Sequence, residues 1–358
     1  NDVTEDPARP WIVEDFRKGR NQWVYYCNTD WYHELYNDQH PITSHSVSIS
    51  GGNKDVKYYI SGGYDRQTGV VKVNPDVFQK YNLRSKIDFK INKYARLSNN
   101  TSFYASSYDW VGAGDVEDSF AYASRHALAC FPLKNPDGTW TYGTPMIAGG
   151  YNVANGRHII FGDGIDKNTK RRTDFSNTTQ LTIKPVEQLS IVGNYTYRLY
   201  QNRDTGRLYP LTYRRYPDSA LESYSSGAGL NELTESVATY VRQSANVFAT
   251  YEDTFADAHH FTLTAGMNAE TYHRKSISAS GQNISTPYLN DLNLIGTDAN
   301  GEVVSSVAGG ATSNALLGFF ARANYDYKGR YLLEVSGRYD GSSRFAPGHR
   351  WGFFPSAS

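Results

Sequence analysis

The sequence predicts an all-β protein, an antiparallel up-and-down β-barrel that spans a membrane. Three observations predict this class: segments in which apolar and polar residues alternate, a composition rich in aromatic residues and glycine, and connections that alternate between short and long. Tyr 29, Phe 16 and Trp 6 give an aromatic fraction of 14%, beside Gly 31. This mixture is typical of many strands joined by turns. At 358 residues the chain exceeds most single hydrophobic cores, so we expect either several domains or one large β architecture.

Charge and hydropathy exclude two classes of function. Lys and Arg together number 36, and so do Asp and Glu, so no net field attracts nucleic acid. No apolar run is long enough for a membrane-spanning helix. The mean hydropathy of -0.59 does not argue against a barrel, because barrel strands alternate instead of being apolar throughout.

Period-2 alternation predicts about eleven strands. They lie at 44–50, 56–64, 79–91, 94–106, 172–184, 188–200, 236–252, 257–272, 312–327, 329–340 and 350–358. In the third strand Leu83, Ile87 and Phe89 share one face, and Arg84, Lys86 and Asp88 share the other. A soluble sandwich core could not accept that charged row, so it must face water. Strands of about ten residues or more also suit a tilted membrane crossing.

Short and long connections alternate along these strands. The short ones are 51–55, 92–93, 185–187, 253–256 and residue 328, and the long ones are 65–78, 107–171, 201–235, 273–311 and 341–349. A barrel with one trimmed rim and one elaborated rim predicts this order, whereas a Greek-key sandwich does not. We expect the short rim to be periplasmic and the long rim to be extracellular.

The N-terminal segment, residues 1–43, is aromatic and fits neither a strand nor a core helix. Because it leads into a strand from the long rim, we expect it to be the remainder of an extracellular loop. We expect 44–358 to form the N-terminal half of the barrel wall. Cys27 and Cys130 are too few for a disulfide scaffold, and the sequence leaves open whether they are bridged. The first residues carry no Met and no signal region, which favours a piece of a longer protein.

Several segments resemble one protein family. They are 28–35 (NTDWYHEL), 44–52 (SHSVSISGG), 57–64 (KYYISGGY), 338–345 (RYDGSSRF) and 350–356 (RWGFFPS). These motifs resemble those of SusC/RagA-type TonB-dependent outer-membrane transporters, and the likeness spans nearly the whole chain.

The resemblance implies a fold and a set of partners. It implies a barrel of about 22 strands, of which about eleven are present here, and a plug domain that this chain does not contain. It further implies import of an oligosaccharide or a peptide across the bacterial outer membrane. The implied partners are a SusD-like surface lipoprotein, the TonB complex through the missing N-terminal part, and the lipid and lipopolysaccharide around the wall.

Two long loops carry candidate ligand-contact residues, because ring faces stack on sugars and guanidinium groups bind carboxylates. The candidates are Trp110, Trp140, Tyr142 and Tyr151 in the first loop, and Arg207, Tyr209, Arg214 and Arg215 in the second. The alternative for the first set is packing of the loop on its neighbours or on the lipoprotein. For the second set it is salt-bridging to Asp204, Asp218 or Glu222.

Polar positions of the strands are expected to line the lumen and the plug. They include Arg84, Lys86, Asp88, Arg322, Asn324 and Arg338. No metal-ligand spacing and no nucleophile, phosphate or dinucleotide motif is present, so we expect no cofactor and no enzymatic activity. Two alternatives stay open: a soluble or surface β-rich carbohydrate-binding protein, and a plain porin or adhesin barrel without a plug.

Overall fold

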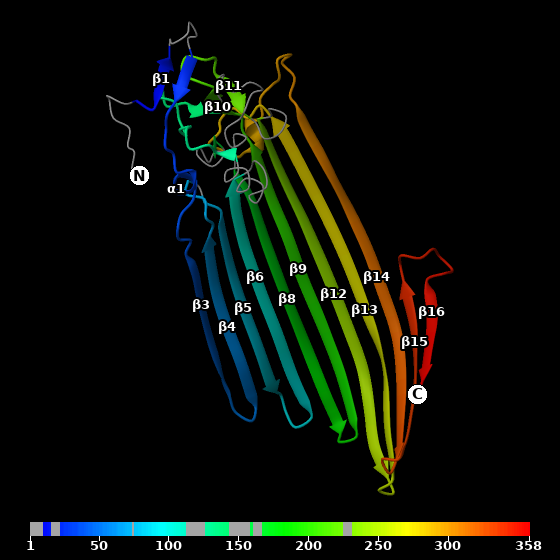
Figure 1. Cartoon of the computed structure of the whole chain (residues 1–358). Helices are drawn as coiled ribbons and strands as arrows, with labels where there is room; N and C mark the ends of the chain where they lie inside the picture. The colour runs from blue at the N-terminus through cyan, green and yellow to red at the C-terminus, as the bar shows by residue number, and fades with distance from the viewer. Residues whose placement is uncertain are drawn as a thin grey trace.

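A computed structural model describes residues 10–15, 22–73, 75–111, 126–142, 158–159, 167–224 and 231–358. One 11-stranded antiparallel sheet contains most of them (Figure 1). Its strands are β3 (Ile42–Gly52), β4 (Val56–Thr68), β5 (Val77–Lys90), β6 (Ala95–Val111), β8 (Lys167–Val186), β9 (Leu189–Leu208), β12 (Glu232–Phe255), β13 (His259–Gln282), β14 (Ser305–Tyr327), β15 (Tyr331–Ser342) and β16 (Trp351–Ala357). Strands that follow one another in this list pair side by side. The predicted all-β, up-and-down fold is therefore confirmed.

Most strands are longer than alternation predicted, and most of the extra length lies on the side of the long connections, whereas β15 has its predicted length and β16 is shorter. Strands β12 and β13 each have 24 residues and pair from Glu232 with Gln282 to Phe255 with His259. Near this end the outward positions become polar, as at His273 and Lys275. The hydrophobic alternation therefore stops while the backbone hydrogen bonds continue, so the predicted ends were too early.

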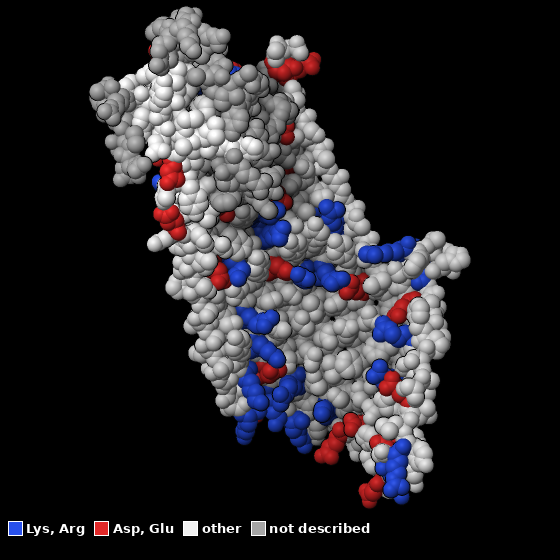
Figure 2. Space-filling model, in the orientation of Figure 1, with Lys and Arg blue, Asp and Glu red and all other residues white. Residues whose placement is uncertain are grey.

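The two faces of the sheet differ in polarity. The register aligns apolar side chains of successive strands on one face, which we call the outward face. Its exposed members include Val47, Ile49, Ile60, Leu83, Ile87, Phe103, Leu181, Val247, Leu263, Met267, Phe319, Leu333 and Val335. The other, inward face carries charge, and Figure 2 shows Lys, Arg, Asp and Glu gathering across the visible side of the sheet. An apolar face of this extent is typical of a wall covered by lipid.

The short turns are closed by local polar contacts and by left-handed backbone. The side-chain oxygen of Asn53 accepts from the backbone nitrogens of Asp55 and Val56 at 2.8 and 2.9 Å. Asn92 makes the same pair of contacts in the turn between β5 and β6. At the turn from β14 to β15, Lys328 and Gly329 have φ of 51° and 66°. These geometries are those of tight hairpins, which hold the register of the strands that they join.

One polar cluster interrupts the outward face. The Asn99 amide donates to Asn177 Oδ1 at 3.3 Å and to Thr179 Oγ1 at 2.8 Å. The Asn177 amide donates in return to Asn99 Oδ1 at 3.2 Å and to Thr101 Oγ1 at 2.7 Å. Because lipid offers no hydrogen-bond partner, amides on such a face have to satisfy one another. The cluster therefore keeps these polar groups paired beside exposed Phe103.

Described parts of the N-terminal segment and of the connections β4–β5, β6–β8 and β9–β12 gather into a small body at one end of the sheet, which we call the cap (Figure 1). It contains β1 (Ile12–Asp15), β2 (Gln22–Tyr25), α1 (Trp31–Leu35), β7 (Trp140–Thr141), β10 (Leu211–Arg214) and β11 (Glu222–Tyr224). One apolar cluster of the cap comprises Tyr25, Trp31, Leu35, Tyr36, Val71 and Phe131, and a second comprises Trp140, Ile159, Leu211 and Tyr213. A 3₁₀ turn, η3 (Leu292–Leu294), lies in a separate connection.

The N-terminal segment is thus more regular than the sequence indicated. Its described residues form β1, β2 and α1, and β3 already begins at Ile42. Elements of four or five residues are too short to be stable alone, so contacts from distant loops must hold them. One such contact joins the Trp31 indole nitrogen to the carbonyl of Leu128 at 2.9 Å. Within the described ranges, no helix is long and apolar enough to cross a membrane.

Placing a charge on the outward face should destabilise the protein more than placing one on the inward face. Val247 is outward and 50% exposed, whereas its neighbour Asn246 is inward and donates to Asn194 at 2.8 Å. We expect Val247→Arg to lower the free energy of unfolding in lipid vesicles by about 2–4 kcal/mol, because an arginine there meets hydrocarbon. Asn246→Arg is the matched control and should cost less than about 1 kcal/mol. Equal losses in a urea titration of the intact protein would contradict the assignment of the faces.

Candidate ligand-contact residues

Trp140, a predicted ligand contact, lies inside the cap. It is 7% exposed and packs in the cluster with Ile159, Leu211 and Tyr213. The ammonium group of Lys134 lies 4.3 Å from the centre of its ring. A sugar could stack on this indole only after the cap rearranged, because both packing and the cation cover the ring.

Arg207, the first predicted arginine, is fully buried and serves as a hydrogen-bond hub. Its guanidinium donates to the carbonyl of Leu208 at 2.6 Å, to Asn231 Oδ1 at 2.7 Å and to the carbonyl of Glu232 at 3.1 Å. The guanidinium carbon also lies 5.4 Å from the ring centre of Tyr209. These contacts tie the start of β12 to the end of β9, so this arginine has a structural role in the described arrangement.

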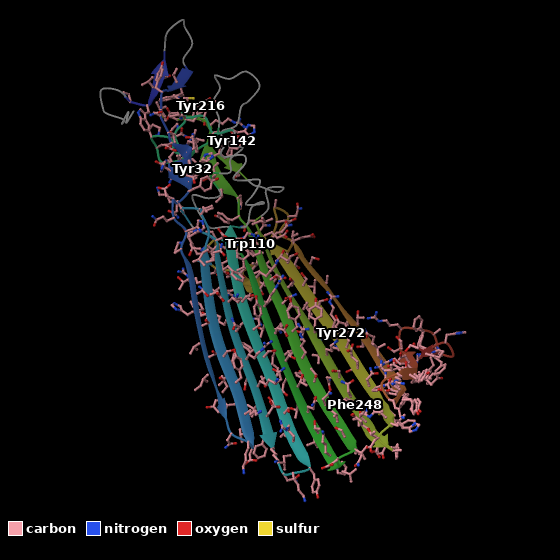
Figure 3. The ribbon with its side chains drawn as sticks, turned by 60° about the horizontal axis from the view of Figure 1, so that its bottom comes forward. Tyr32, Trp110, Tyr142, Tyr216, Phe248 and Tyr272 are labelled. Atoms are coloured by element: carbon pink, nitrogen blue, oxygen red, sulfur yellow. The ribbon has the colours of Figure 1, made fainter. Side chains whose placement is uncertain are left out.

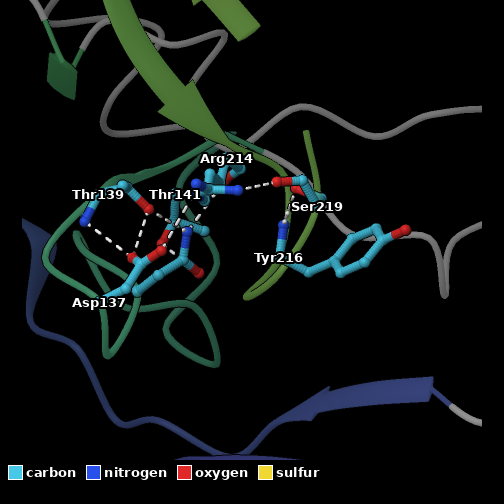
Figure 4. A network of polar contacts seen from close by, with 7 residues as sticks. Asp137, Thr139, Thr141, Arg214, Tyr216 and Ser219 are labelled. Carbon is cyan, nitrogen blue, oxygen red and sulfur yellow. Dashed lines mark hydrogen bonds and ion pairs between the residues drawn. The ribbon is translucent and has the colours of Figure 1, made fainter. Parts of the chain in front are cut away.

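Arg214 is held by polar contacts within the cap (Figure 4). Its Nε lies 3.1 Å from Asp137 Oδ2, and its Nη1 donates to the carbonyl of Ser219. Asp137 also accepts from the backbone nitrogen and the hydroxyl of Thr139, at 3.0 and 2.6 Å. The partner of this arginine is therefore an acid from the first loop, and not one of the three acids that the sequence analysis named.

Arg215 and Tyr142 lie together beside Glu222. Arg215 donates to both carboxylate oxygens of Glu222, at 2.8 and 3.1 Å, so this predicted alternative of a salt bridge is present. The Tyr142 ring centre is 4.3 Å from that of Tyr213 and 5.7 Å from the Arg215 guanidinium carbon. Tyr142 is half-buried, so part of its ring surface stays accessible.

The cap therefore brings together Trp140, Tyr142, Arg214 and Arg215, while Trp110 lies elsewhere. Trp110 belongs to β6 and stacks on Tyr108, with ring centres 4.8 Å apart and an interplanar angle of 15°. Tyr151 lies outside the described residues. Whether any of these residues contacts a ligand stays a prediction.

The polar positions expected in the lumen share the inward face. The register aligns them there, and they are Arg84, Lys86, Asp88, Arg322, Asn324 and Arg338. Asp88 accepts from the Ser98 hydroxyl at 2.5 Å, and Arg322 lies 3.5 Å from Glu334.

Arg338 crosses a neighbouring strand to reach its partner. Its Nη2 donates to Asn268 Oδ1 at 3.0 Å, and its guanidinium contacts both oxygens of Asp340 at 2.9 and 3.1 Å. Gly318 lies between Asn268 and Asp340 in the register. A Cβ at Gly318 would come within 2.2 Å of Asp340, so only glycine leaves room for the guanidinium to reach across β14.

A further group on the inward face combines ring faces with paired charges, and none of its residues was among the predicted ligand contacts. Arg198, Tyr200, Tyr240, Arg242 and Tyr272 line a hollow of about 410 Å³ across β9, β12 and β13. These residues lie at even positions of three strands that the register aligns. The alternation pattern could have found four of them, since Arg198, Tyr200, Tyr240 and Arg242 each adjoin apolar Leu199 or Val241 on the outward face, whereas Tyr272 lies between Thr271 and His273.

No group of three or more His, Cys, Asp and Glu side chains among the described residues could hold a metal ion. Cys27 is buried and Cys130 is exposed, and no disulfide joins them. The backbone nitrogen of Cys27 nevertheless donates to the carbonyl of Cys130 at 3.3 Å.

Comparisons with known proteins point to one family. The chain is 26% identical over 342 residues to the TonB-dependent receptor P3 of Formosa agariphila, covering 93% of this chain and 31% of that protein. It is also 26% identical over 353 residues to the TonB-dependent receptor SusC of Bacteroides thetaiotaomicron, covering 92% of this chain and 32% of SusC. The chain thus spans about a third of the length of these relatives. No protein-family model matches the sequence.

Solved structures show the same fold. The RagAB peptide importer in its closed-closed state superposes with a TM-score of 0.70 at 21% identity, over 93% of this chain and 35% of the RagAB chain. The open-open state of the same importer gives a TM-score of 0.70 at 20% identity.

Acid should loosen the pairing of β10 with β11. Arg215 and Tyr213 donate hydrogen bonds to Glu222, and they hold the pKa of this carboxyl below its usual 4.5. A depressed pKa contributes stability above the unfolded-state value, and this contribution is lost as the pH falls through the folded-state value. We therefore expect faster amide exchange in β10 below about pH 4 than at pH 7, after correction for intrinsic rates.

The matched variant is Glu222→Gln. It should show loosened pairing already at pH 7 and little further change on acidification. An acid response equal to that of the unaltered chain would mean that another group controls the pairing.

Proposed function

Because its sequence relatives and its fold identify the chain as a SusC-type TonB-dependent transporter barrel, we propose that it forms part of the wall of an energy-coupled outer-membrane importer. The nutrient is an oligosaccharide or a peptide, and the energy comes from the TonB complex. A SusD-like surface lipoprotein assists capture. The printed names of RagAB, a peptide importer, and of SusC, a TonB-dependent receptor, leave both nutrient classes open for this chain.

The observation that carries the proposal is the opposite polarity of the two faces of the sheet. Exposed Val247, Leu263 and Met267 lie outward, while Arg198, Arg242 and Arg322 lie inward. A soluble protein would bury such an apolar face in a core. Lipid and lipopolysaccharide around the wall, with water or protein within it, account for both faces at once.

The division of the chain follows from the same arrangement. In the proposal, residues 1–43 belong to an extracellular loop and 44–358 to the barrel wall, with the long connections extracellular. The gathering of β1, β2, α1, β10 and β11 at a single end of the sheet supports this orientation, because the opposite end has only short turns.

The wall itself has a passive role, and the proposal assigns it no enzymatic step. Outward residues anchor the barrel in lipid, and inward charges line the path and meet the plug. Arg338, which is 47% exposed although it is paired with Asp340, is suited to such a contact, because paired guanidinium groups keep unused donors.

Deleting the gene for the intact protein tests the proposal. We expect the deletion strain to lose growth on at least one oligosaccharide or peptide as sole carbon source and to keep growth on monosaccharides and amino acids, which porins admit. A plasmid copy should restore growth, and inactivation of TonB should remove it again. A plain porin would support the same growth without TonB, and normal growth of the deletion strain on every nutrient tested would contradict import.

A further inference from the structure

The inward hollow on β9, β12 and β13 has the chemistry of a sugar site. We define the tyrosine belt as Arg198, Tyr200, Tyr240, Arg242 and Tyr272, the residues that line it. The belt lies partway along the wall, between the cap and the short-turn end where Phe248 lies, and Figure 3 labels Tyr272 and Phe248. We propose that the tyrosine belt binds a neutral saccharide on the inner wall. The inference rests on the proposed import function and assigns one of its two nutrient classes.

Three neighbouring rings supply the stacking surface. The ring centres of Tyr200 and Tyr240 are 5.4 Å apart, and those of Tyr240 and Tyr272 are 6.4 Å apart. Both pairs are tilted at 45°, so the rings do not stack face to face on one another. Faces left open in this way are available to the C–H groups of sugar rings. The row thus offers contacts to consecutive units of a chain.

The two arginines of the belt are paired with acids, which favours a neutral ligand over an anionic one. Arg198 contacts both oxygens of Asp174, at 2.9 and 2.5 Å, and Arg242 lies 3.1 Å from Glu270. A guanidinium has five donors and a carboxylate about four acceptor sites, so each pair keeps unused donors and acceptors. The hydroxyl groups of a sugar use both donors and acceptors. A peptide carboxylate would bind well only to an arginine whose salt bridge to its acidic partner had been broken.

Arg274 restricts the orientation of Tyr240, the middle ring of the belt. Its guanidinium carbon lies 5.6 Å from the Tyr240 ring centre, and its Nε donates to the Tyr240 hydroxyl at 3.4 Å. The cation therefore fixes the orientation of Tyr240 and occupies part of its surroundings. Tyr272 and Tyr200 flank this fixed ring, so a saccharide would meet Tyr272 on one side and Tyr200 on the other.

Small residues next to the belt leave space for a ligand. Thr196 and Ser244 are partners in the register one step nearer the short turns, and Thr178 pairs with Thr196 on the other side. The hydroxyls of Thr178 and Thr196 lie 2.8 Å apart. Short hydroxyl side chains beside the large rings add further groups for sugar hydroxyls.

The test uses the intact purified transporter and an array of neutral linear glucans, xylans, mannans and galactans. We expect the unaltered protein to bind at least one of them, and that oligosaccharide then serves as the calorimetric probe. Tyr240→Ala and Tyr272→Ala should each raise its Kd about tenfold, because each removes a stacking face. Tyr272→Phe, which keeps the ring, should stay within about threefold. Ser244→Phe, which places a bulky ring beside the hollow, should weaken binding without removing any belt ring.

The control is Tyr195→Ala. Tyr195 lies on β9, as Tyr200 of the belt does, but on the outward face, where its side chain is 46% exposed. It should bind the probe like the unaltered protein. Heat-modifiable migration in gels establishes that each variant folds. Binding of peptides alone, or unchanged Kd in the Tyr240→Ala, Tyr272→Ala and Ser244→Phe variants, would overturn the saccharide site. In either case, TonB-dependent growth would leave the import function standing.

Discussion

The constraint on which the structure depends is that each backbone amide and carbonyl of the wall must bond to a neighbouring strand. In the proposed wall, lipid provides no alternative partner, and the strands pair continuously from β3 to β16. Continuous pairing fixes the register, and a slip of one residue would turn Val247 inward and Arg242 outward. The opposite polarity of the two faces and the row of tyrosines are consequences of this register. The Asn99 and Asn177 amides obey the same requirement at side-chain level.

The alternation of apolar and polar residues was enough to predict the wall, because it reflects directly the different environments of the outward and inward faces. All eleven predicted strands are present in the predicted order, and the resemblance to SusC-type transporters is confirmed by the relatives. Strand ends were not predictable. Near His273 and Lys275 the outward positions are polar, so side chains no longer record the pairing that the backbone continues. The Arg338 contact across Gly318 was also hidden, because it joins residues from three strands.

The cap shows the limit of reading residue types without contacts. Trp140 and Arg207 have the chemistry of ligand contacts, yet one packs in an apolar cluster and the other holds carbonyl groups of loop ends. Aromatic and guanidinium groups serve folding and binding equally well, and only their neighbours separate the two uses. On the inward face the same residue types remain accessible in an ordered row. The wall therefore has a surface suited to ligand, while the cap uses similar residues to hold its short elements together.

The central claim, that one face meets lipid and the other an aqueous lumen, is tested most directly by spin labels along β5. Single labels at positions 83, 84, 86, 87, 88 and 89 of the intact protein, in native outer membranes, report collision with oxygen or with a water-soluble nickel complex. Labels replacing Leu83, Ile87 and Phe89 should collide mainly with oxygen, and those replacing Arg84, Lys86 and Asp88 mainly with nickel. A mobile, aqueous signal at Leu83, Ile87 and Phe89 would contradict the barrel wall.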